Sequence, residues 1–130
     1  MKEIIIENKG EKYSEMLYKV VEEFDKELPA ELSFENTLEI GIEAWNLANK
    51  KEFLESNNLY QKELENYEYS EVIDKMVSFK LEHFSKSDNI IVDYSTENDT
   101  LKVKTQTAEN HFNSFFNNIV FTNSKQTTKK

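Results

Sequence analysis

The sequence predicts a single α+β domain that is predominantly α-helical, with four to five helices packed against a small antiparallel sheet or hairpin near the C-terminus. Apolar residues recur at three- and four-residue spacing over several segments, and the period changes to two over residues 90–106. The chain has 130 residues, which suits one domain, and Leu, Ile, Val and Phe account for 35 of them, enough for a core. We expect a compact domain over residues 1–121 and a disordered Lys- and Thr-rich tail over residues 122–130.

A short strand and two helices are predicted in the N-terminal part. Three consecutive isoleucines within residues 2–7 favour a strand, because β-branched side chains suit extended backbone. Apolar residues at helical spacing predict a helix over residues 11–27, and Pro29 stops it because proline cannot continue a helix. Ser33 is expected to cap the next helix, which runs to about residue 50. The apolar face of this helix carries Leu38, Ile42 and Trp45.

The middle of the chain has a less regular helical pattern. Residues 50–70 contain a break at Asn57 and Asn58, with a helical turn before it and a short helix after it. Ser70 then begins the clearest helix of this half, which continues to about residue 84.

A hairpin is predicted near the C-terminus. Residues 90–95 and 101–106 alternate between apolar and polar side chains, which is typical of half-buried strands. The polar segment between them contains Asn98 and Asp99, where we expect the turn. Apolar residues recur at helical spacing again after residue 107. Whether this segment is a helix or a strand stays open.

The chain is acidic, with a net charge of −9 and an isoelectric point near 4.8. This charge opposes binding to nucleic acid, whose phosphate backbone is also negative. All 16 basic residues are lysines, so no guanidinium is present to bind phosphate in a bidentate manner. Eight acids concentrate in one segment, where they either form a partner-binding face or only keep the protein soluble: Glu22, Glu23, Asp25, Glu27, Glu31, Glu35, Glu39 and Glu43.

Composition disfavours several kinds of site. The chain has no cysteine for a disulfide or a thiol nucleophile, and His83 and His111 lack the HExxH spacing of a zinc site. Two glycines are too few for the loops that bind nucleotide phosphates. We therefore expect a non-enzymatic protein with no catalytic residue, metal or cofactor. No apolar run approaches the roughly 18 residues of a membrane span, so we expect a soluble, cytoplasmic protein without a membrane partner.

Lys80 interrupts the apolar stripe of the helix that begins at Ser70. Its side chain either lies along apolar surface and extends the ammonium into water, or pairs with a carboxylate. Asp93 is the candidate partner, because it interrupts the otherwise apolar segment IIVDY. Such a pair would fix how the hairpin docks, whereas an unpaired Asp93 would lie on the open face of the sheet.

Aromatic residues suggest two further sites. Trp45 and Asn46 either line a ligand pocket or belong to the core, and the helical phase of Trp45 with Leu38 favours the core. An aromatic cluster near the C-terminus either closes the core or forms an interface between copies of the chain. Its members are Phe112, Phe115 and Phe116.

A helix containing AWNLA, a second helix and an I-DY hairpin follow one another between about residues 34 and 107. Their residues are Ala44, Trp45, Asn46, Leu47 and Ala48, then Ile73, Met76, Lys80 and Phe84, then Ile91, Asp93, Tyr94, Leu101 and Val103. In this order they resemble a family of small uncharacterised bacterial proteins. The resemblance implies a similar helical domain with a hairpin and brings no known activity or ligand.

These observations favour a small acidic binding protein. The first hypothesis is a non-enzymatic module that recognises a basic protein partner, of the immunity or inhibitor type. Two alternatives stay open. One is a homo-oligomeric assembly component, and the other is a small-ligand-binding protein or enzyme with a pocket near Trp45 and Tyr94.

Overall fold

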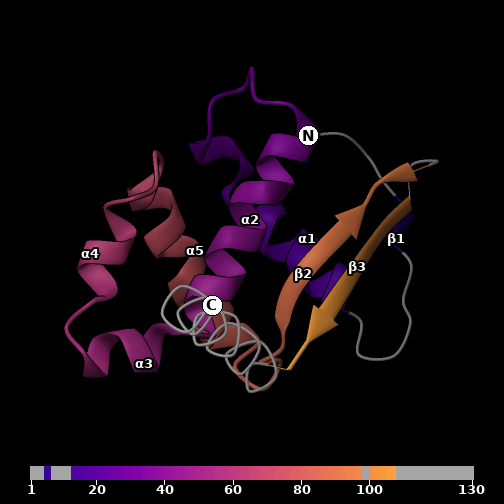
Figure 1. Cartoon of the computed structure of the whole chain (residues 1–130). Helices are drawn as coiled ribbons and strands as arrows, with labels where there is room; N and C mark the ends of the chain where they lie inside the picture. Colours follow the sequence, from indigo (N-terminus) through magenta and orange to yellow (C-terminus); the bar gives the residue numbers. More distant parts are fainter. Residues whose placement is uncertain (1–4, 7–12, 98–99, 108–130) are drawn as a thin grey trace, which may run out of the picture.

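The computed structural model describes residues 5–6, 13–97 and 100–107 (Figure 1). It confirms an α+β fold dominated by helices, with an antiparallel hairpin near the C-terminal end of the described chain. The elements in chain order are β1 (Ile5–Ile6), α1 (Tyr13–Phe24), the 3₁₀ turn η1 (Asp25–Glu27), α2 (Phe34–Ala48), α3 (Lys51–Ser56), α4 (Tyr60–Leu64), α5 (Ser70–His83), β2 (Ile90–Ser95) and β3 (Thr100–Gln106).

The sheet has three strands in the order β1–β3–β2. β2 and β3 form the expected antiparallel hairpin, whereas β1 pairs with β3 in parallel, Ile5 opposite Thr100 and Ile6 opposite Leu101. This parallel pairing joins opposite ends of the described chain. Local periodicity predicts a strand there but gives no information about its partner.

α2 is the central helix. It packs against both α1 and α5, and it also contacts β2. α1 lies against β3, so α1 and α2 together support the hairpin. α3 and α4 lie on the side of α2 and α5 that faces away from the sheet (Figure 1). One side of α2 is therefore not covered by the other described helices.

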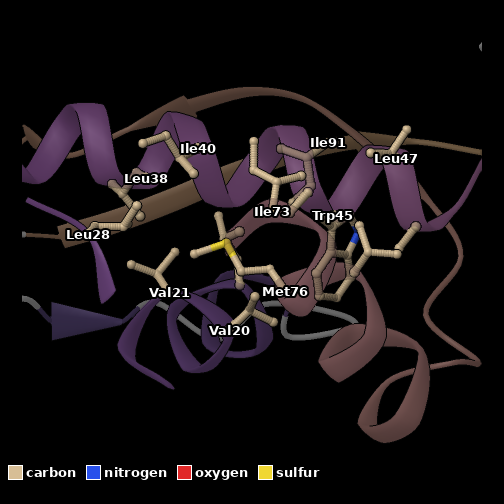
Figure 2. Packing of buried hydrophobic residues seen from close by; sticks show 14 of the residues in the cluster. Val20, Val21, Leu28, Leu38, Ile40, Trp45, Leu47, Ile73, Met76 and Ile91 are labelled. Carbon is tan, nitrogen blue, oxygen red and sulfur yellow. The ribbon is translucent and has the colours of Figure 1, made fainter. Parts of the chain in front are cut away.

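The hydrophobic core forms where α1, α2 and α5 meet. Met76 lies in the middle of the packed side chains, with Leu28 and Leu38 toward one end and Trp45 toward the other (Figure 2). All four are at most 6% exposed. Their removal from water is the main force that holds the three helices together.

Local signals set the helix ends. The Ser33 hydroxyl accepts a hydrogen bond from the Asn36 backbone N–H at 3.0 Å, which confirms the predicted cap of α2. α1 ends at Phe24, and η1 leads the chain toward Pro29. Asn58 separates α3 from α4 with a φ of 58°, a left-handed conformation that asparagine tolerates better than most residues.

Strand β2 departs from the predicted alternation at Val92. Ile91 pairs with Thr105 and Asp93 pairs with the adjacent Lys104, so Val92 is an extra residue, a β-bulge. Ile90 and Ile91 are both buried, whereas Val92 is 44% exposed. The bulge therefore turns an apolar side chain to the surface.

Gly41 lets α2 approach α1 closely. A Cβ atom at this position would collide with Val21 Cγ2 and would lie 3.4 Å from Leu17 Cδ1. We expect Gly41→Ala to lower the free energy of unfolding by about 1–2 kcal/mol, although alanine is the better helix former, because overpacking outweighs propensity. Urea denaturation measures the change. In a Val21→Ala background the loss of stability caused by Gly41→Ala should nearly vanish. An equal loss in the two backgrounds would contradict the collision.

Several predictions concern residues outside the described part of the chain. The aromatic cluster Phe112, Phe115 and Phe116, the end of the domain at residue 121 and the tail over residues 122–130 all lie there. Their roles in the core, an oligomer interface or a tail stay predictions. Among the described residues, no helix has the length and apolar character needed to cross a membrane.

Candidate functional site

Polar side chains of α2 fix the segment that leads into β2. The Trp45 indole N–H donates to the Asn89 carbonyl at 3.0 Å, and Asn49 Nδ2 donates to the same oxygen at 2.9 Å. From α1, the Tyr13 hydroxyl oxygen accepts the Asn89 N–H at 3.1 Å. Asn89 is thus held by both helices before the hairpin begins.

Asn46 extends this attachment to the strand itself. Its amide donates to the Ile91 carbonyl and accepts from the Ile91 N–H, both at 2.8 Å. These two bonds satisfy both backbone groups of Ile91 on the side away from β3, as a neighbouring strand would. The side chain that was considered for a ligand pocket is therefore occupied by the protein's own backbone.

We expect Asn46→Asp to destabilise the protein by about 1–3 kcal/mol, because a carboxylate accepts the Ile91 N–H but cannot donate to its carbonyl. Denaturation in urea gives the loss, and hydrogen exchange should show faster opening of β2. Asn66→Asp, at an exposed position, is the control and should stay within about 0.5 kcal/mol. Equal effects of the two substitutions would contradict this role of Asn46.

Lys80 is fully buried, and its partners differ from those expected. Its ammonium donates to Asn49 Oδ1 and lies 4.8 Å from the centroid of the Trp45 ring. Neither the extension into water nor the pairing with Asp93 occurs. Asp93 is exposed beyond the bulge, and its carboxylate accepts the Tyr94 N–H at 2.9 Å.

Burial lowers the pKa of Lys80 to about 8, and the negative charge of Asp88 opposes that shift. The ammonium has an amide oxygen and an aromatic face as its close partners, and these compensate only part of the lost hydration. Because the side chain is inaccessible to a ligand, we regard Lys80 as a structural group.

Trp45 also belongs to the core, as its phase predicts. Its ring packs edge-on against Tyr13, with centroids 5.6 Å apart, and near Phe84 at 6.2 Å. His83 lies on the outside of α5 with its ring centroid 4.3 Å from that of Phe79. In the described ranges no group of three or more acidic or histidine side chains is placed to hold a metal ion.

The predicted acidic residues are distributed over several elements. All except Asp25 are exposed. Glu22 and Glu23 belong to α1, and the Glu27 carboxylate accepts a hydrogen bond from Lys75 Nζ of α5 at 2.7 Å. Glu31 lies in the connection between η1 and α2. The remaining three follow one side of α2 at four-residue spacing: Glu35, Glu39 and Glu43.

These three glutamates, named here the α2 acidic face, lie beside the hairpin. The Tyr94 hydroxyl donates to Glu39 Oε2 at 2.9 Å, and the Thr96 hydroxyl donates to Glu35 Oε2 at 3.3 Å. Burial and the bond to Glu39 raise the pKa of Tyr94 to about 12. The hairpin thus holds two of the carboxylates in place.

A hollow of about 340 Å³ opens between α2 and β2 next to this face. Its walls combine carboxylates with apolar and aromatic side chains: Glu39, Ile42, Glu43, Ile91, Val92, Asp93 and Tyr94. Partial burial at the hollow, together with the negative charge of Glu39, raises the pKa of the Glu43 carboxyl. The two neighbouring glutamates therefore place acidic groups at a partly buried position of the hollow.

No protein-family model, curated protein or solved structure matches the chain. The resemblance carried by AWNLA and the I-DY hairpin accordingly stays a prediction.

Sequence reasoning missed Asn49 and Val92, and it assigned Asn46 no structural partner. The amides follow Trp45 on a nearly enclosed helix, which indicates that they face protein rather than water. No comparable signal exists for Val92, because its exposure results from the bulge.

Proposed function

We propose that the protein is a non-enzymatic binding module whose α2 acidic face recognises a basic partner protein, in the manner of an inhibitor or immunity protein. The observation that carries the proposal is an ordered row of carboxylates without compensating cations. Glu35, Glu39 and Glu43 are exposed, and within the described residues no lysine forms an ion pair with any of them.

The charge of the whole chain supports this proposal. At a net charge of −9 the protein attracts cationic surfaces over long range, and local carboxylates then determine orientation. The same charge disfavours nucleic acid as the partner. The absence of cysteine agrees with a cytoplasmic location for the module.

A lysine-rich peptide, labelled for fluorescence anisotropy, tests the proposal with the full chain. We expect binding at low ionic strength that weakens as salt is added. The triple variant Glu35→Gln, Glu39→Gln and Glu43→Gln should lose at least about tenfold in affinity, because each substitution removes a carboxylate of the face.

A second triple variant controls for net charge. Glu52→Gln, Glu65→Gln and Glu71→Gln change exposed acids of other elements by the same amount of charge. This variant should lose less than about threefold in affinity. Equal losses in the two triple variants, or no binding by the unmodified chain, would overturn the proposal.

A further inference from the structure

Part of the lining of the hollow beside the α2 acidic face is apolar and exposed to solvent. Val92 is 44% exposed here because of the bulge, and Ile42 of α2 lines the opposite wall. Bulges commonly redirect a side chain next to a functional site. An apolar lining alone would suit many occupants, so the charged residues of the hollow decide which chemistry fits.

Part of the lining of the hollow is acidic. Glu39 and Glu43 line it from α2, and Asp93 lines it from β2, whereas no lysine of the described part of the chain lines it. In the hairpin register Asp93 stands opposite Lys104, and among the described residues no ion pair joins the two side chains. The two glutamates of α2 and Asp93 together form the cation-attracting edge.

The shape and charge of the hollow fit a long side chain with an apolar stem and a cationic end. Lysine and arginine have this form, since their methylene stems pack on apolar surface while their charged groups bind carboxylates. The bond from the Tyr94 hydroxyl holds Glu39 at the edge before any partner arrives, which lowers the entropy cost of binding.

We infer that the hollow receives one lysine or arginine side chain of the basic partner, with its stem on Ile42 and Val92 and its cation between Glu39 and Glu43. The inference rests on the proposed function, because it assigns an anchor within the proposed acidic interface. It adds a specificity that charge attraction alone does not supply, since the stem as well as the charge is recognised.

Two short peptides of equal charge test this inference against the full chain. One alternates lysine with glycine, and the other replaces each lysine by 2,4-diaminobutyric acid, whose stem is shorter by two methylenes. We expect the lysine peptide to bind about fivefold to tenfold more tightly, as the burial of the extra methylenes predicts. Its titration should also shift the methyl NMR signals of Val92 and Ile42.

Val92→Thr keeps the branched shape but replaces a methyl group by a hydroxyl, and it should reduce the preference for lysine about threefold. Leu59→Thr is the control, because Leu59 is another exposed apolar residue, 39% exposed, at the start of α4. The control should leave the preference unchanged.

The outcomes separate the two proposals. Salt-sensitive binding that the α2 triple variant weakens, combined with equal affinity for both peptides and unchanged methyl signals of Val92, would overturn the anchor while the acidic interface stands. An equal change in the preference for the lysine peptide in Val92→Thr and Leu59→Thr would also overturn the anchor. If neither peptide binds, the proposed function and the anchor fail together.

Discussion

Replacing Trp45 by alanine should lower the free energy of unfolding by about 3–5 kcal/mol, the largest loss expected from a single substitution in this protein. Trp45 is fully buried, and its ring joins Tyr13 of α1 to α2. The same side chain donates to Asn89 and covers the ammonium of Lys80. Its removal would leave a cavity, and the Asn89 carbonyl would lose one of its two donors, since Asn49 Nδ2 still reaches it. Urea denaturation followed by circular dichroism measures the loss.

Trp45→Phe separates the two contributions and guards against an unfolded alanine variant. Phenylalanine retains an aromatic ring but has no N–H to donate to Asn89, so we expect a smaller loss of about 1–3 kcal/mol. Phe53→Ala, at a side chain that is 52% exposed, should cost less than about 1 kcal/mol. A loss below that of Phe53→Ala for either Trp45 variant would contradict the central role of the indole.

The elements that sequence predicted well depend on local chemistry. The apolar spacing of α1, α2 and α5 sets their existence, and Ser33 sets where α2 begins. The hairpin followed from alternation over two strands. Periodicity and capping act within a few residues, so each can be recognised without the fold.

The features that sequence did not predict depend on contacts between distant segments. Lys80 interrupts an apolar stripe, which indicates burial or a special partner, but Asn49 became that partner only because α2 packs beside α5. Asp93 was the more natural candidate by charge. A bulge of one residue turned it toward solvent, and nothing in the segment IIVDY specifies a bulge.

The candidate site was predicted in part for the same reason. The four-residue spacing of Glu35, Glu39 and Glu43 is visible in the sequence, and on a helix this spacing places them on one side. Their position beside Tyr94 depends on the docking of the hairpin on α2. The same docking forms the hollow that Val92 lines. A row of acids could be predicted from sequence, whereas a shaped site for a cationic side chain could not.

The free energy of unfolding should rise by about 2 kcal/mol between pH 7 and pH 9.5, because Lys80 titrates at a lower pH in the folded chain than in the unfolded chain. Burial lowers the pKa of Lys80 in the folded chain to about 8, against an ordinary value of 10.5. Between these two values the unfolded chain binds the additional proton, so an increase in pH favours the folded state. The cost of the buried charge is fully present below pH 8 and disappears toward pH 10.5. Urea denaturation across this range measures the rise.

Lys80→Met removes the titrating group and fills the same space, and its stability relative to the unmodified chain should decline by that amount over the same pH range. Lys75→Met is the control on the same helix. Hydrogen bonding to Glu27 raises the pKa of Lys75, so the titration of Lys75 changes stability only above the ordinary lysine value.

Tyr67 and Tyr94, whose pKa values are raised to about 12, reduce stability only as the pH exceeds about 10. The fluorescence of Trp45, the single tryptophan, should report the Lys80 titration directly, with a midpoint near pH 8. A stability difference between Lys80→Met and the unmodified chain that stays constant with pH would show that the buried ammonium retains its ordinary affinity for protons.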